Sequence, residues 1–166
     1  QKYAEASGNT PGVKKARKYL GYAHIYKGNT ELKAEKYDEA INDFNESLAY
    51  SPENIKAYYG LGLAYLKTDN EPKMKEAMDK VIAMGPAEDK TVGKAKSAAG
   101  KYYLGKSGIK LEKLKYDEAI VLLNNSLEYI SDNPDTYYYL AIAYNNTKAF
   151  DKAAAIGEQG LSIAGE

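Results

Sequence analysis

Apolar residues recur at three- and four-residue steps along most of this chain, in pairs of runs separated by short polar turns. In residues 57–86 the first run contains Leu61, Ala64 and Tyr65, and the second contains Ala77, Met78, Val81 and Ile82. This spacing places the apolar side chains on one face of an α-helix. Short polar stretches such as residues 67–70 supply turns and helix caps. The pattern therefore predicts amphipathic helices that pair through their apolar faces.

The same pattern returns later in the chain. The phrase KYDEAI occurs at residues 36–41 and again at 115–120, an offset of 79 residues. At this offset residues 13–87 align with residues 92–166 without a gap, and 24 of the 75 pairs are identical. Each half divides again, because residues 57–86 repeat the organisation around the first KYDEAI after 34 residues. The chain is a tandem duplication of a two-unit segment.

A 34-residue period with a Leu-Gly pair, tyrosines, alanine and a closing proline resembles the tetratricopeptide repeat (TPR) family. The second unit carries Tyr58, Leu61, Gly62, Tyr65, Met78 and Pro86, and the fourth carries Tyr137, Leu140, Ala141, Tyr144 and Ala153. The first carries Tyr37, Ala40, Phe44 and Pro52, and the third carries Tyr116, Ala119 and Leu123. The resemblance covers residues 13–166. It implies an all-α fold, a right-handed α-solenoid of stacked antiparallel helix pairs with about eight helices.

The motif positions have physical reasons of their own. Gly62 and Ala141 fall where two helix backbones would cross, and Pro52 and Pro86 end the second helix of their units. One helix pair cannot bury its own apolar face, so successive pairs must stack. We therefore expect an N-terminal tail, residues 1–12, and a single domain, residues 13–166. Its units would span residues 13–54, 55–88, 89–133 and 134–166.

The repeat spacing is uneven. The step from Ala40 to Met74 is 34 residues, but the step from Met74 to Ala119 is 45. The extra residues predict long first helices in units one and three, with room for a kink at the glycines of these helices, Gly21, Gly28, Gly100, Gly105 and Gly108. A rival register places residues 20–21 at the Leu-Gly position and treats residues 28–34 as an insertion. We prefer the register without an insertion, although it places Glu31 and Lys110 where an apolar residue is usual.

Charge is balanced overall but segregated along the chain. The 23 basic and 23 acidic residues cancel, yet residues 13–36 hold seven basic and two acidic residues, whereas residues 37–54 hold five acidic and none basic. The second half repeats this alternation. The basic helices are either solvated faces with weak mutual pairing or a surface that attracts an acidic partner. Nucleic acid is not an expected partner, because Arg17 is the only arginine and there is no basic excess.

Catalytic chemistry has few candidates. There are no cysteines, and the single histidine, His24, lies where other units place tyrosine, which favours a packed helix residue over a catalytic base. The acidic pairs at residues 38–39 and 117–118 fall at helix starts, where negative charge stabilises the helix dipole. No phosphate loop, nucleophile elbow or metal-ligand spacing is present. We expect no enzyme activity, no cofactor and no metal, and no apolar run is long enough for a membrane span.

The remaining function class is binding of a peptide or partner protein, for which an acidic partner is one candidate. In the TPR family the first helices of each pair line the concave face. The resemblance places on that face Tyr22, Ile25, Tyr26, Asn29, Lys56, Tyr59, Leu63, Lys101, Leu104, Tyr138, Tyr139, Ile142 and Asn145. Tyrosine offers a large apolar surface with a polar tip, which suits recognition. We therefore expect a non-enzymatic interaction module or scaffold.

Some TPR proteins hold the acidic C-terminal tail of chaperones in a five-residue clamp. Asn29 and Lys101 match two of its positions, but Ile25, Gly60 and Gly105 occupy the other three. Two of five positions do not make a clamp, so chaperone-tail binding is not predicted.

Two other functions stay open. The last helix has Gly157 and Gly160 where unit two has Met78 and Val81, and no polar capping helix follows in this sequence. The chain is therefore either a monomer or a homodimer, or larger assembly, through its C-terminal end. A tyrosine-lined groove that stacks on sugars is a further alternative. The start at Gln1 fits a trimmed recombinant form or a mature exported protein, and we favour an exported or periplasmic location over a cytoplasmic one.

Overall fold

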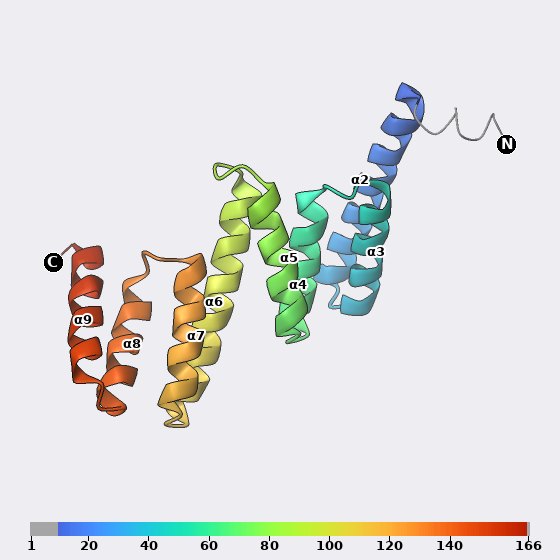
Figure 1. Ribbon diagram of the computed structural model, residues 1–166. Coiled ribbons are helices and arrows are strands. Elements are labelled where there is room, and N and C mark those ends of the chain that lie inside the picture. Colours follow the sequence, from blue (N-terminus) through green and yellow to red (C-terminus); the bar gives the residue numbers. More distant parts are fainter. Residues whose placement is uncertain (1–9, 166) are drawn as a thin grey trace. The chain divides into compact units, whose positions relative to one another are not determined.

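The computed structural model describes residues 10–165, and Figure 1 shows them as a succession of helices. The helices are α2 (Pro11–Lys33), α3 (Tyr37–Tyr50), α4 (Ile55–Lys67), α5 (Glu71–Met84), α6 (Lys90–Glu112), α7 (Tyr116–Tyr129), α8 (Pro134–Asn146) and α9 (Phe150–Ala164). Between residues 10 and 165 there are eight helices and no strand. The predicted all-α fold of helix pairs is confirmed.

Contacts divide the chain into two compact units that meet within α6. The first compact unit, unit 1, runs to Ala95 and contains α2 to α5 with the start of α6. The second, unit 2, begins at Lys96 and contains the rest. Units 1 and 2 are these two compact parts of the chain, and they differ from the four repeat units of the sequence. In unit 1, α2 packs on α3, α3 on α4 and α4 on α5, and in unit 2, α7 packs on α8 and α8 on α9. Within each unit these consecutive helices therefore pack on one another, as in a repeat protein.

The first helices of the two halves are long, as predicted. Helices α2 and α6 each have 23 residues, whereas α4 and α8 have 13. The chain passes from α2 to α3 through residues 34–36 alone, so the register without an insertion is correct. Helix α2 is unbroken at its glycines. Gly21 and Gly28 allow close packing instead. A Cβ on Gly28 would lie 2.9 Å from Cε1 of Phe44, and one on Gly21 would lie 3.0 Å from Oγ of Ser51.

The helices begin and end at residues that suit these roles. Asn54, Asn70 and Asn133 each cap a helix by accepting a hydrogen bond from a backbone N–H of the first turn. Within each pair, a three-residue turn places its second residue in the left-handed region, and these residues are Glu35, Asp69, Leu114 and Lys148. The same turn geometry in all four pairs reflects their common origin.

The two cores use different side chains for the same packing. In unit 1 the core surrounds Phe44, together with Ala40, Leu61 and Ala77, and a Cβ on Gly60 would overlap the Phe44 ring. In unit 2 the smaller Leu123 takes the place of Phe44, and the position of Gly60 is occupied by Tyr139. Tyr58, Tyr65 and Tyr144 lie against these cores, and Tyr137 is buried.

Candidate partner-binding surfaces

Unit 1 contains an open cleft beside the N-terminal half of α2. Its volume is about 770 Å³. The cleft is lined by Lys14, Arg17, Lys18, Tyr22, Tyr50, Ser51, Pro52, Glu53, Asn54, Ile55, Lys56 and Asp89. Four of these side chains are cationic and two are anionic, so we call this site the basic cleft.

The basic wall of the cleft comes from the extra turns of α2. The side-chain oxygen of Thr10 accepts a hydrogen bond from the backbone N–H of Val13 and caps the helix. Lys14, Arg17 and Lys18 then follow at steps of three and four residues, which brings them to neighbouring positions on the helix surface. All three are exposed. The Lys18 ammonium lies 5.9 Å from the ring centre of Tyr22, so the cationic wall continues into an aromatic one.

The opposite wall is the connection between α3 and α4. Asn54 fixes the start of α4 by accepting a hydrogen bond from the N–H of Lys56 at 3.1 Å. Asp89 at the far edge accepts a hydrogen bond from the N–H of Thr91 at 2.6 Å. Hydrogen bonds from Thr91 and the charge of Lys56 lower the pKa of Asp89. Asp89 is thus engaged with its own surroundings, which leaves the cations of α2 to dominate the cleft.

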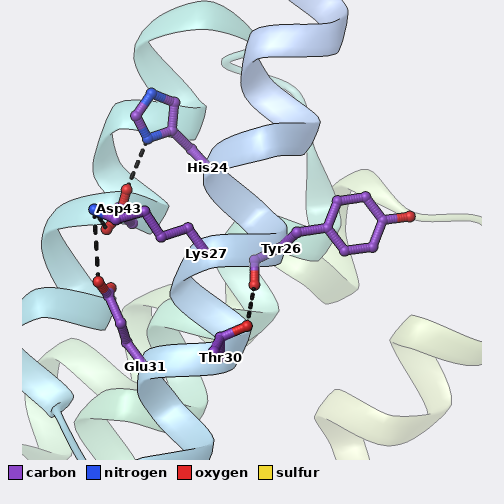
Figure 2. Close-up of polar contacts among 6 residues, drawn as sticks. All are labelled: His24, Tyr26, Lys27, Thr30, Glu31 and Asp43. Atoms are coloured by element: carbon purple, nitrogen blue, oxygen red, sulfur yellow. Dashed lines mark hydrogen bonds and ion pairs between the residues drawn. The ribbon is translucent and has the colours of Figure 1, made fainter.

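The predicted face residues of unit 1 have mixed exposure. Tyr22 lines the basic cleft, and Asn29 and Lys56 are exposed. Tyr26 is 75% exposed, and in Figure 2 its ring points away from the polar contacts between α2 and α3. Tyr59 and Leu63 on α4 are half-buried, and burial raises the pKa of the Tyr59 hydroxyl. Ile25 is buried at 6% exposure, because it faces the core side of α2, so it offers no surface to a partner.

In unit 2 the exposed members of the predicted set lie on α6 and α8. Lys101 and Asn145 are exposed, and Ile142 is half-buried. Tyr138 and Tyr139 are exposed and meet edge to face, with ring centres 5.3 Å apart. Leu104 packs against the core around Leu123 instead of lining a free surface.

A polar cluster that the sequence did not predict lies between α2 and α3 (Figure 2). Asp43 on α3 is 2% exposed, and its carboxylate accepts hydrogen bonds from Lys27 Nζ at 2.7 Å and lies 2.8 Å from His24 Nδ1. Lys27 also pairs with Glu31 at 3.5 Å. Burial raises the pKa of Asp43, but the hydrogen bonds from Lys27, His24 and Glu31 outweigh it and the pKa is lowered.

Glu31 and Lys27 respond to the same cluster. Burial, followed by a hydrogen bond to Asp43, raises the pKa of the Glu31 carboxyl. The hydrogen bond to Asp43 raises the pKa of Lys27. Asp43 contributes to both shifts, because a buried carboxylate favours protons on its neighbours. The polar cluster thereby joins α2 to α3.

The residues of the polar cluster have packing roles. The imidazole of His24 bonds to Asp43 on one side and stacks on Tyr50, with ring centres 5.7 Å apart, which is the packed role predicted for it. Within residues 10–165 no group of three or more acidic or histidine side chains could hold a metal ion. No helix in this range has the length and apolar content needed to cross a membrane.

Family models place this chain among known proteins. A TPR repeat model matches residues 28–69, and a tetratricopeptide repeat model matches residues 111–165, together more than half of the chain. The chain belongs to the tetratricopeptide repeat family. Its helix pairs are those of a protein–protein interaction scaffold.

Relatives of this TPR protein include much longer chains. It is 25% identical over 109 residues to an Hsp70-Hsp90 organizing protein of Triticum aestivum, which covers 66% of this chain and 17% of that protein. It is 29% identical over 69 residues to a cell division cycle protein 27 homologue of Caenorhabditis elegans, which covers 42% of this chain and 9% of that protein. The TPR chain thus spans a small part of each relative.

Solved structures share the fold. The Arabidopsis OM64 TPR domain matches with a TM-score of 0.51 and 18% identity, covering 78% of this chain and 98% of that one. MamA from Desulfovibrio magneticus RS-1 matches with a TM-score of 0.50 and 15% identity, covering 87% and 75%. At these identities the likeness concerns the fold alone.

Proposed function

We propose that this TPR protein is a non-enzymatic module that binds an acidic segment of a partner protein in the basic cleft and along the adjoining faces of α2 and α4. The observation that carries the proposal is the gathering of Lys14, Arg17, Lys18 and Lys56 around one cleft with tyrosine in its walls. A protein-binding scaffold needs a site that distinguishes its partner from other proteins. The cleft offers such a site because it combines positive charge with aromatic side chains.

The chemistry of the cleft favours an acidic peptide with apolar residues. Lysine and arginine attract carboxylates and accelerate encounter. Tyr22 and Tyr50 offer large side chains that lose little entropy on binding. Tyr26 and Asn29 are exposed farther along the same helix, beyond the cleft. A partner segment in an extended conformation can therefore run from the cations onto these side chains.

The wheat relative is named an Hsp70-Hsp90 organizing protein. Some TPR proteins hold the tails of chaperones in a clamp. The clamp positions of this chain do not support that ligand. Ile25 stands at the first lysine position and is buried, and Gly60 stands at an asparagine position against Phe44. The basic cleft lies instead at the extended start of α2, which suggests a different acidic partner.

The test is selection from a displayed random-peptide library with the wild-type protein, followed by titration of the selected peptides. Acidic peptides should be enriched, and Arg17→Glu/Lys18→Glu should weaken their binding by roughly tenfold or more because two attractive charges become repulsive. The matched control is Lys94→Glu/Lys96→Glu, which makes the same charge change at two exposed positions of α6 outside the cleft. Selection of peptides without acidic residues, or equal losses in both variants, would refute the proposal.

A further inference from the structure

The last helix pair leaves an apolar groove uncovered. The groove has a volume of about 280 Å³ and lies between α8 and α9, and we call it the end groove. It is lined by Pro134, Tyr138, Ala141, Gly157, Gly160, Leu161 and Ala164, none of which is charged. Leu161 is 53% exposed and Tyr138 is 63% exposed. Helix α9 contains no buried residue.

The duplication provides an equivalent surface in the first half of the chain, and that surface is covered. The residues equivalent to the lining of the end groove, 79 positions earlier, are Ile55, Tyr59, Gly62, Met78, Val81, Ile82 and Gly85. There the start of α6 covers the pair α4–α5. A Cβ placed on Gly85 would lie 2.5 Å from Cγ2 of Val92 and 3.3 Å from Cδ1 of Ile55. Val81 and Met78 are fully buried.

The helix equivalent to α6 is α2, and the matching part of α2 is uncovered. Val92, Ala95 and Ala99 share one face of α6 and are at most 2% exposed. Their equivalents on α2 are Val13, Ala16 and Leu20. Val13 is only half-buried, Ala16 is exposed and Leu20 is 45% exposed. The chain therefore carries both halves of one repeat interface, with neither half covered within the described residues.

We propose that the face of α2 formed by Val13, Ala16 and Leu20 docks into the end groove of a second copy of this chain. The start of α2 would lie on α8 and α9 of that copy as the start of α6 lies on α4 and α5. Val13 would take the place of Val92, next to Pro134 and Ala164, the equivalents of Ile55 and Gly85. Ala164 carries a Cβ where Gly85 has none, so Val13 would lie farther from Ala164 than Val92 lies from Gly85.

Side-chain sizes support this docking. On the end-groove side, glycines 157 and 160 replace Met78 and Val81, which leaves the groove hollow. On the α2 side, Leu20 replaces Ala99 and adds bulk. The end groove has lost side-chain volume and the α2 face has gained it. The larger Leu20 side chain can therefore fill space that the glycines leave, as close packing of apolar surfaces requires.

Charges around the two faces are complementary as well. Residues 13–20 of α2 contain Lys14, Lys15, Arg17 and Lys18 and no acidic residue. Helix α9 contains Asp151, Lys152 and Glu158 and has a net charge of −1, whereas α5 has three acidic and three basic residues and is neutral. Opposite charges at the rim favour the pairing of α2 with α9 over the pairing of α9 with another α9.

The docking joins two different surfaces, so it does not close into a dimer. Each added copy exposes a new end groove, and the assembly grows with concentration. Lys14 and Lys18 lie on the other side of α2 from Val13, Ala16 and Leu20, whereas Arg17 neighbours Val13 and Leu20 on the helix surface. Docking therefore leaves Lys14 and Lys18 available to a peptide and borders the basic cleft at Arg17.

The test is sedimentation velocity over a range of protein concentrations with Leu20→Glu and Leu161→Glu, each of which blocks one face. Both side chains are exposed, and circular dichroism checks that the variants stay helical. The wild type should form species larger than a dimer at high concentration, and each variant alone should lose self-association. An equimolar mixture of the two variants should form a one-to-one dimer, because one intact face of each kind remains.

The control is Val121→Glu, which places a glutamate at a more exposed apolar position on α7 and should assemble like the wild type. A wild type that stays monomeric at all concentrations would overturn the docking. Self-association of Leu20→Glu alone would also overturn it, because the end grooves would then pair with each other. The same holds for a mixture of the two variants that remains monomeric.

Discussion

His24 Nδ1 lies 2.8 Å from Oδ1 of Asp43, and this contact between α2 and α3 exists in only one half of the duplicated chain. In the other half the equivalent residues are Tyr103 and Leu122. Tyr103 is buried and stacks on Tyr129, as His24 stacks on Tyr50. The first half thus has a hydrogen-bonded polar pair at the two positions that Tyr103 and Leu122 occupy in the second half.

This difference predicts strong coupling between His24 and Asp43. Asp43→Leu alone should destabilise the protein by about 1–3 kcal/mol, because Lys27 and His24 lose a buried acceptor. His24→Tyr/Asp43→Leu should recover part of that loss, since it recreates the pair of the other half. Urea unfolding of the wild type, both single variants and the double variant gives the coupling energy, expected at about 0.5–3 kcal/mol. Additive losses would show that the two positions act separately.

The contact between Gly60 and Phe44 predicts a second exchange between the halves. Gly60→Ala should destabilise the protein by about 1–3 kcal/mol, because the new Cβ would overlap the buried Phe44 ring. The same substitution should cost less in a Phe44→Leu background, where the core resembles that around Leu123. Thermal unfolding measures both effects.

The control for this exchange is Gly108→Ala on α6, which meets nothing within 4 Å. It should stabilise the protein by about 0.5–1 kcal/mol, because alanine is the better helix former. If Gly60→Ala also stabilised the protein, the close contact with Phe44 would be wrong.

Glu118 predicts a pH dependence of stability in unit 2. Its carboxylate accepts hydrogen bonds from Lys110 at 2.6 Å and Lys115 at 2.8 Å, and these lower its pKa to about 2. Because the pKa is lower in the folded state than in the unfolded chain, the stabilisation is present above about pH 4.3 and is lost as the pH falls towards 2. The stability difference between wild type and Glu118→Gln should shrink over that interval in urea titrations.

The equivalent residue in the first half provides the control for the pH experiment. Glu39 aligns with Glu118, but Glu31 aligns with Lys110. One of the two lysines that pair with Glu118 therefore has no counterpart in the first half. Glu39→Gln should therefore show a smaller change of stability between pH 4.3 and pH 2. A constant difference between wild type and Glu118→Gln across this interval would contradict the assigned ion pairs.

The helices could be predicted from the sequence because the 34-residue period and the 79-residue offset repeat both the apolar positions and the turns. The long α2 and α6 followed from the uneven spacing alone. The role of the helix glycines could not be predicted, because a glycine in a helix is compatible with a kink or with close packing. Only the position of Phe44 against Gly28 and Gly60 decides between these roles.

The surface was less predictable than the fold. Asp43 lies in an acidic stretch whose composition is typical of a solvated face, and its burial depends on three partners that α2 brings to it from 12 to 19 residues away. Ile25 shares a helix with the exposed Tyr26, and a small error in the helix rotation moves a residue from the surface to the core. The basic cleft depends on the fold of the connection between α3 and α4, which has no periodic signal.

Crosslinking at the basic cleft tests the central claim, that this TPR protein binds an acidic segment there. A photoreactive phenylalanine analogue would replace Tyr22, which lines the cleft, or Val121, which is 60% exposed on α7. With a selected acidic peptide, the account predicts a covalent adduct at position 22 that excess unlabelled peptide and high salt suppress, and no adduct at position 121. Peptide that binds with unchanged affinity but forms no adduct at position 22, or equal adducts at both positions, would contradict it.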